Sequence, residues 1–293
     1  MKRGIDHLVL CVRDLEAARE RYRSLGFTLT PRGVHPFGTA NSLVQFRSNY
    51  LELLTVADPT MIPPPALERF SFGAFNRDLL ARREGFSMLA LQTDDAEADA
   101  AEFRAKGIGF YAPFRFERQA RQLDGSEATV AFSLAFATDS SMPEAVFFTC
   151  RHHAPQFFWK PEYQRHDNGA LDVREVVIAA ANPSLLTHIL EQLFGPRRVK
   201  RTATGLRAET GSGAVSVMSS EAFAPRFAGG LPATAPATPH FAAFVVEVAD
   251  LDRARAALAK AGAPIRESEH LAILPPDHAF GVTIAFVHQE SKC

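Results

Sequence analysis

The chain has 293 residues, 46% of them hydrophobic, and a formal net charge of −1, which suits two domains of about 150 residues each. This near neutrality gives no electrostatic attraction to a phosphate backbone or an anionic membrane surface, so we expect a small-molecule partner, no nucleic acid and no membrane. Three scattered cysteines are too few for a disulfide framework, and no signal-like segment or apolar run of about 18 residues is evident, which predicts a cytoplasmic protein.

The first predicted unit is a strand, a helix and three more strands. An apolar strand over residues 5–12 leads through Asp14 into a helix over 15–25, whose apolar residues recur three and four positions apart. Further strands are expected at 27–34, 41–47 and 50–56. The unit is therefore a βαβββ module.

A proline-rich bridge and a short helix then lead to a second module of the same kind. The elements expected here are the bridge at 58–67, the short helix at 79–83, a strand at 87–93, a helix at 96–106 and strands at 109–118, 128–137 and 145–151. Two more helices of this type, each ending near a glycine, recur at 182–195 and 250–262. The module is therefore used four times.

Four copies of the module predict how the chain is divided. A half-open sheet of three or four strands cannot bury its concave face alone, so modules must pair and enclose a space. The predicted fold class is α+β, with four βαβββ modules paired into two open-barrel domains. We expect an N-terminal domain at 1–155, a linker at 156–170 that carries the single tryptophan, Trp159, and a C-terminal domain at 171–293.

The opening module also resembles a known family. The glyoxalase-like branch of the vicinal oxygen chelate superfamily is similar to this chain over IDHLVLCVRDLEAARERYRSLGFTLTPRGVHPFGTANSLVQF, followed by YLELLTV. The similarity covers the first module and extends to the other three only through the repeat. It implies glyoxalase-like open barrels, and many members bind one divalent metal inside the barrel. Members include isomerases, epimerases, extradiol dioxygenases and metal-free antibiotic-binding proteins.

The resemblance implies that His7 on the first strand and Glu52 on the fourth are metal ligands. Alternate residues of a strand share one face, so both side chains are expected to point into the barrel. An imidazole and a carboxylate in an apolar bowl suit Zn, Fe, Mn or Ni as the divalent metal. The alternative is that His7 is a hydrogen-bonded core residue and that an internal partner neutralises Glu52.

The partner module departs from the ligand set of the superfamily. Alignment places Met88 where the superfamily has a second His, and Phe148 or Cys150 where it has a second Glu. Because His152 shares one face of the last strand with Cys150, we expect His152 to complete a three-ligand metal site with the two ligands of the first module.

The loop GVHPFGTAN in the first module supplies further candidates. Its glycines and proline predict a tight turn that leaves His35 and Asn41 free to bind substrate at the barrel mouth, together with Phe132 from a Phe-rich wall. His35 and Glu52, if close, would transfer protons near neutral pH, so both are candidate catalytic residues. The alternative for Asn41 is that it only caps the turn.

On the same alignment the second domain carries no metal set. The four corresponding positions are Glu175, Ser216, Ala243 and Ala285. Two-domain extradiol dioxygenases resemble this architecture but keep two His and one Glu in the C-terminal domain, so that activity is disfavoured.

Two function classes stay open. The first is a metal-dependent lyase or isomerase acting on a small carbonyl-containing substrate. The second is a metal-free protein that sequesters a small molecule between its modules, which the apolar residues Met88 and Ala243 favour. A homodimer paired across sheet edges is compatible with either class.

Overall fold

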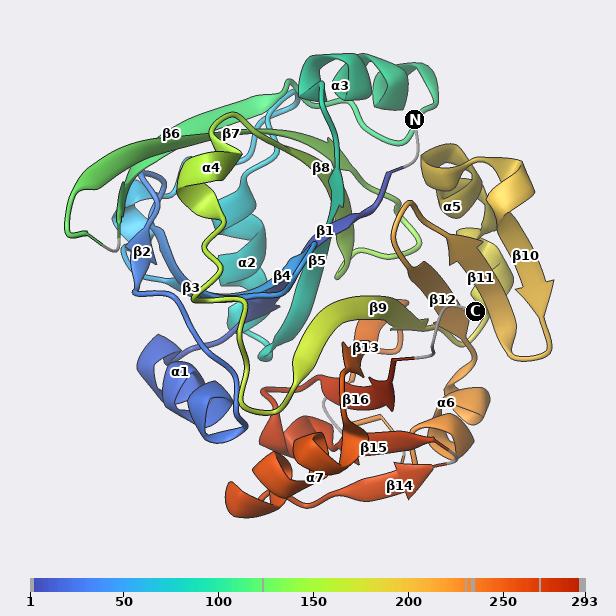
Figure 1. Ribbon diagram of the computed structural model, residues 1–293. Helices are drawn as coiled ribbons and strands as arrows, with labels where there is room; N and C mark the ends of the chain where they lie inside the picture. The colour runs from blue at the N-terminus through green and yellow to red at the C-terminus, as the bar shows by residue number, and fades with distance from the viewer. Residues whose placement is uncertain (1–2, 123, 230, 233–234, 269, 290–293) are drawn as a thin grey trace.

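The chain folds into two eight-stranded sheets that follow one another along the sequence (Figure 1). The computed structural model describes residues 3–122, 124–229, 231–232, 235–268 and 270–289. The first sheet contains β1 (Ile5–Cys11), β2 (Gly33–Val34), β3 (Thr39–Gln45), β4 (Tyr50–Val56), β5 (Gly85–Gln92), β6 (Phe114–Arg121), β7 (Glu127–Ala137) and β8 (Val146–His152). The second contains β9 (Ala170–Ala179), β10 (Val199–Thr202), β11 (Gly205–Glu209), β12 (Ala214–Met218), β13 (His240–Val248), β14 (Arg266–Ser268), β15 (Leu271–Leu274) and β16 (Thr283–His288).

Seven α-helices and four 3-10 turns lie in the described part of the chain. The α-helices are α1 (Leu15–Ser24), α2 (Phe72–Leu80), α3 (Ala96–Ala105), α4 (Pro155–Phe158), α5 (Thr187–Phe194), α6 (Ser220–Arg226) and α7 (Leu251–Lys260). The 3-10 turns are η1 (Pro59–Met61), η2 (Pro183–Leu186), η3 (Pro196–Arg198) and η4 (Pro276–His278). Across these described residues, no helix has the length and apolar character needed to cross a membrane.

The strand order shows how the modules pair. In the first sheet the order is β2-β3-β4-β1-β5-β8-β7-β6, and in the second it is β10-β11-β12-β9-β13-β16-β15-β14. Each half of a sheet is one βαβββ module, and the first strands of the two modules join antiparallel at the centre, β1 to β5 and β9 to β13. The predicted fold class, four modules paired into two open barrels, is confirmed.

Local chemistry sets the ends of the module helices. The carboxylates of Asp14, Asp95 and Asp250 accept hydrogen bonds from backbone N–H groups two or three residues later, at the starts of α1, α3 and α7. Gly26 and Gly107 follow the ends of α1 and α3 with φ of 87° and 70°, a conformation that other residues adopt only at a cost. The predicted helix starts and ends are therefore found in the structure.

Four elements differ from the sequence expectations. The strand predicted at 27–34 shrinks to β2, because Pro31 cannot donate to a ladder, and β6 begins only after Pro113 for the same reason. The short helix predicted at 79–83 is α2, which starts earlier because the Ser71 hydroxyl caps Ala74 N–H. The linker predicted at 156–170 begins within α4 (Pro155–Phe158).

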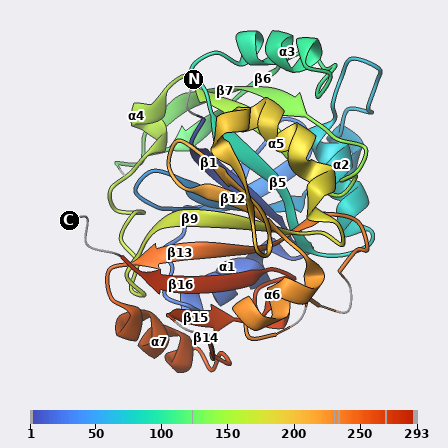
Figure 2. The same ribbon diagram turned by 90° about the vertical axis from the view of Figure 1, so that its right-hand side faces the viewer.

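The two faces of each sheet have different partners. The convex faces share one apolar core with the outer helices and with each other; Phe86 of β5 stacks on Phe241 of β13 with ring centroids 4.5 Å apart. The concave faces carry separate apolar clusters. Phe72 of α2 packs in the first and Phe223 of α6 in the second. Figure 1 shows α2 inside the ring of first-sheet strands, and Figure 2 shows β9, β13 and β16 running side by side beneath the N-terminal half.

His166 fastens the segment between the two sheets to the first sheet. Its side chain is buried, its Nδ1 accepts a hydrogen bond from Thr28 N–H at 3.0 Å, and its Nε2–H donates to the Gln45 carbonyl at 2.9 Å. Protonation of Nδ1 would place a second ring proton against the Thr28 N–H. Burial also disfavours the charged imidazolium and lowers the pKa of His166 to about 4.

We expect His166 to make the protein sensitive to mild acid. The unfolded chain binds a proton at this imidazole below about pH 6.5 and the folded chain only near pH 4, so the free energy of unfolding should fall by about 3 kcal/mol between pH 7 and pH 4. Urea unfolding across this range, compared with His166→Gln, measures the contribution. The exposed His188 gives a matched control, His188→Gln. Equal pH slopes in wild type and His166→Gln would contradict the prediction.

Candidate active site

A small cavity of about 30 Å³ lies inside the first barrel, with space for roughly two water molecules. Its walls are mostly aromatic and aliphatic side chains. The polar residues that line it are His7, His35, Asn41, Tyr50, Glu52, Arg118 and Cys150. Five of the six residues singled out in the sequence, His7, His35, Asn41, Glu52 and Phe132, therefore meet around one space.

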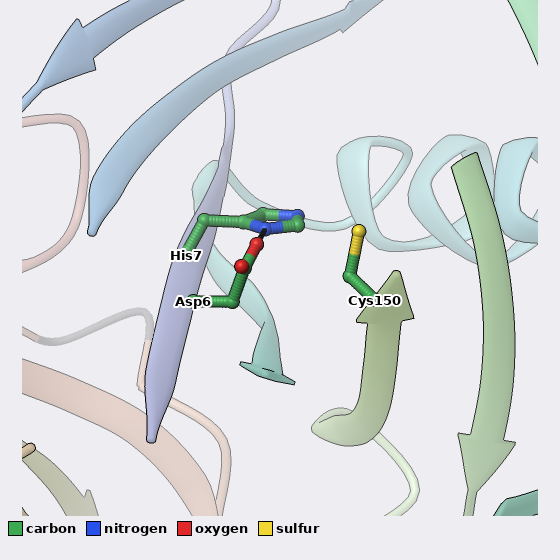
Figure 3. A group of neighbouring side chains, drawn as sticks. All are labelled: Asp6, His7 and Cys150. Atoms are coloured by element: carbon green, nitrogen blue, oxygen red, sulfur yellow. Dashed lines mark hydrogen bonds and ion pairs between the residues drawn. The ribbon is translucent and has the colours of Figure 1, made fainter. Parts of the chain in front are cut away.

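His7 reaches the cavity from β1 and is fixed by the residue before it. The pairing of β1 with β5 shifts register between Ile5 and His7, and this irregularity brings Asp6 beside His7 instead of on the opposite face. Nδ1–H of His7 donates to Asp6 Oδ1 at 2.6 Å, as Figure 3 shows. The other ring nitrogen, Nε2, therefore carries the lone pair and is free to bind a ligand.

Glu52 faces His7 from the neighbouring strand, β4. Its Oε2 lies 3.8 Å from His7 Nε2, and only 5% of the residue is exposed. Burial in this apolar wall raises the pKa of Glu52 above its ordinary value, although His7 and the amide of Asn41 favour the ionised form. The carboxylate is thus held in a place where a cation would stabilise it.

His35 and Asn41 form a polar chain that ends on Glu52. Asn41 Nδ2 donates to Glu52 Oε1 at 2.5 Å and to His35 Nε2 at 3.2 Å. His35 Nε2 therefore carries no proton, and Nδ1–H donates to Thr39 Oγ1 at 2.8 Å. Burial lowers the pKa of His35 to about 3, so its imidazole is neutral near pH 7.

Aromatic rings hold the two imidazoles in orientation. Tyr50 stacks on His7 with ring centroids 4.3 Å apart and planes inclined by 13°, and Phe148 meets the same imidazole edge-on at 5.3 Å. Phe37 stacks on His35 at 4.9 Å. Each imidazole can therefore turn little, which keeps Nε2 of both rings within 4 Å of a Glu52 oxygen.

Two sets of donor atoms in the described residues could hold a metal ion. Donor atoms of Asp6, His7 and Cys150 lie within 4.8 Å of one another (Figure 3). In that set, however, Asp6 already accepts a hydrogen bond from His7 Nδ1–H. Burial also raises the pKa of the Cys150 thiol well above its ordinary value. The better pair is His7 Nε2 with Glu52 Oε2, because metal bonds of about 2.0–2.2 Å place tetrahedral ligand atoms roughly 3.4 Å apart.

His152 lies behind this pair instead of in the cavity wall. Its Nε2–H donates to Asp6 Oδ1 at 3.1 Å, so Asp6 accepts hydrogen bonds from two imidazoles. Burial alone would raise the pKa of Asp6, but His152 and His7 together hold it well below its usual range. His153, on the opposite face, hydrogen-bonds Ser133 Oγ at 2.8 Å.

The sequence reasoning missed Asp6, Tyr50 and Arg118. Strict alternation put Asp6 on the wrong face, since a register shift has no clear sequence signal. Arg118 had a readable signal, because it alternates with Phe114 and Phe116 along β6 and therefore shares their face of the strand.

The corresponding place in the second barrel is occupied by an ion pair. Glu175 of β9 accepts hydrogen bonds from Nη1 and Nη2 of Arg226 of α6, at 2.9 and 2.6 Å. Burial alone would raise the pKa of Glu175, but Arg226 brings it below its usual value. Ala243 and Ala285 belong to the apolar cluster around this pair. A neutralised carboxylate there has no need of a metal ion.

Comparison with known proteins gives one family and several similar folds. The sequence model described as glyoxalase-like domain matches residues 5–194. No curated relative matches the chain in sequence.

Several solved structures of similar fold cover nearly the whole chain. A hypothetical protein from Staphylococcus aureus has a TM-score of 0.67 at 14% identity, covering 97% of this chain and 99% of that one. The Mn(II)-bound glyoxalase from Novosphingobium aromaticivorans has a TM-score of 0.55 at 11% identity, covering 98% and 83%. A triply substituted 4-hydroxymandelate synthase from Streptomyces coelicolor has a TM-score of 0.54 at 10% identity, covering 99% and 93%. At identities of 10–14%, the similarity to these structures shows a shared fold alone.

Proposed function

The chain belongs to the glyoxalase-like domain family of the vicinal oxygen chelate superfamily, and from that membership we propose that it is a metal-dependent lyase or isomerase. The substrate is a small carbonyl-containing compound, and the reaction takes place in the first barrel. A divalent ion, Zn, Fe, Mn or Ni, is held there by His7 and Glu52.

The observation that carries this proposal is the pairing of His7 Nε2 with Glu52 Oε2, 3.8 Å apart in a buried cavity. Asp6 fixes the tautomer of His7 that leaves Nε2 free, which is how carboxylates orient metal-binding imidazoles in proteins. The raised pKa of Glu52 marks a carboxylate that its protein neighbours do not fully compensate. Both features suit a cation between the two side chains.

The residues of the cavity then divide the chemistry. His7 and Glu52 would hold the divalent ion, which would supply Lewis-acid stabilisation of the negative charge on a carbonyl oxygen. Glu52 is the base that takes a proton from the carbon beside the carbonyl, because its buried carboxylate lies next to the place where the carbonyl oxygen would bind. His35, with a pKa of about 3, is a weak base near pH 7. Because the N–H donors of His35 and Asn41 are already bonded within the protein, we assign the two residues to orienting Glu52.

His152 has a supporting place in this proposal. Because its Nε2–H is bonded to Asp6, we assign His152 to holding Asp6, which in turn orients His7. The remaining coordination positions stay open for substrate and water, as a catalytic metal requires.

Elemental analysis of protein purified without a histidine tag tests the proposal. We expect about one divalent ion per chain in the wild type and less than a tenth of that in His7→Ala, because an imidazole ligand is lost. His188→Ala, an exposed histidine on α5, is the matched control and should keep the metal. A metal-free wild type, after reloading with each of the four ions has failed, would contradict metal dependence.

The second candidate is a metal-free protein that binds and sequesters a small molecule. It is favoured by the apolar side chains of Met88 and Phe148, which belong to the concave cluster where the superfamily has two more ligands. It is also favoured by the Asn41 amide, which already occupies Glu52 Oε1. A metal-free wild type that still binds apolar compounds in the first barrel would select this function.

A further inference from the structure

A groove on the molecular surface adjoins the cavity of the first barrel. It has a volume of about 410 Å³ and lies where the barrel stays open, between its edge strands β2 and β6 and beneath α4. Figure 1 shows these three elements gathered on one side of the barrel. Leu43, Arg118 and Phe158 line both the groove and the inner cavity. These three side chains therefore separate a ligand in the groove from the paired His7 and Glu52.

The groove is strongly positive. Arg32, Arg118, Arg121 and Lys160 line it, against a single carboxylate, Glu127. In the described part of the chain, none of these four cations has a carboxylate oxygen within the 4.0 Å of an ion pair. A concave surface with unpaired charges of one sign attracts and concentrates small ligands of the opposite sign. The rest of the chain compensates this charge, since the net charge is −1.

Arg118 is the cation that reaches farthest inward. Its guanidinium lies over Gly33 of the opposite edge strand, where a side-chain carbon would come within 3.2 Å of Arg118 Cζ and 2.7 Å of Asn41 Oδ1. Its Nε is buried and has no hydrogen-bond partner among the described residues. A buried guanidinium donor without an acceptor is costly, and an oxyanion would satisfy it.

We propose that the substrate is a small carbonyl compound with an anionic group, and that Arg118 binds that group at the boundary between the groove and the cavity. This rests on the proposed function for the reaction itself and adds the class of substrate. The anion enters along the basic groove, pairs with the guanidinium, and places its carbonyl toward His7 and Glu52. The fork of N–H donors suits the two oxygens of a carboxylate, and a phosphate monoester offers the same chemistry.

A matched pair of probes tests the charge preference. The probes are 3-benzoylpropanoate, which carries a ketone, an aromatic ring and a carboxylate, and its neutral methyl ester. Binding to the purified protein is followed by the fluorescence of Trp159, the single tryptophan, which adjoins the groove residues Phe158 and Lys160. Phenyl phosphate against phenol, titrated in the same way, distinguishes a phosphate from a carboxylate ligand.

We expect the wild type to bind the acid about 10-fold to 100-fold more tightly than the ester. Arg118→Gln should reduce this preference to less than about 3-fold, whereas Arg115→Gln should retain it. Arg115 is the matched control because it lies on β6 but is exposed on the opposite face. The proposal would be overturned if the wild type showed no preference, which includes binding neither probe at its solubility limit. It would also be overturned if the preference survived in Arg118→Gln.

Metal analysis of the same samples separates this inference from the proposed reaction. Metal retained in Arg118→Gln, with the preference lost, assigns the anion to Arg118 and not to the ion. A metal-free wild type that still shows an Arg118-dependent preference would remove the reaction and leave the anionic ligand in place.

Discussion

Replacing Glu52 by glutamine is expected to weaken metal binding at least 100-fold and to lower kcat/KM at least 1,000-fold. The first effect, about 2.7 kcal/mol, follows because the only charged ligand of the pair is lost while its shape is kept. The second adds the loss of the carboxylate that takes the substrate proton. Chelator competition measures the affinity, and initial rates on an anionic carbonyl substrate measure the turnover.

His35→Gln provides the comparison for this result. Because His35 Nε2 is bonded to Asn41, its loss should lower the metal affinity less than about 10-fold. Equal losses in the two variants would contradict the assignment of Glu52 as ligand and His35 as a hydrogen-bonding neighbour.

Misfolding of Glu52→Gln is checked separately by urea unfolding. Since burial destabilises the Glu52 carboxylate in the metal-free protein, Glu52→Gln should unfold at the same urea concentration as metal-free wild type, or at a higher one.

Arg3→Met is expected to destabilise the protein by about 3–5 kcal/mol. The Arg3 guanidinium is buried, lies 2.6 Å from Asp99 Oδ1 on α3, and donates to the carbonyl of Leu193 on α5 at 3.0 Å. Its removal leaves the buried Asp99 without a cation and frees a link between the two halves of the chain. Urea unfolding at pH 7, followed by far-ultraviolet circular dichroism, gives the change.

The double variant Arg3→Met/Asp99→Ala distinguishes an unpaired charge from lost packing. It should recover at least half of the lost stability, because no uncompensated carboxylate then remains inside. Removal of the exposed ion pair between Arg77 and Asp78, by Asp78→Asn, should change stability by less than about 1 kcal/mol. An effect of Arg3→Met as small as that one would contradict the prediction.

The fold could be predicted because its signals are local and repeated. An Asp or Asn at each helix start, a glycine after the helix and an alternating strand define one module. Four copies of that module leave few ways to bury the concave faces. The inward direction of His7 and Glu52 follows from the same alternation. The sequence was therefore enough to predict that these two side chains face one cavity.

The residues around His7 and Glu52 could not be predicted from the sequence, because their positions depend on how strands and helices pack together. Asp6 lies beside His7 through a register shift between strands, and His152 shares a face with Cys150 but lies one step beyond the end of the cavity. Arg226, which neutralises Glu175, comes from a helix 51 residues away. Tertiary contacts bring these residues together, and the spacing of residues along the chain does not reveal such contacts.

The shared convex core has a consequence for dividing this protein. Phe86 and Phe147 of the first sheet both contact Phe241 of the second, and all three are almost wholly withdrawn from solvent. A fragment that ends after the first barrel would expose Phe86 and Phe147 as an apolar patch on the convex face of the sheet that carries His7. The second sheet therefore keeps the apolar convex face of the first sheet covered in the intact protein.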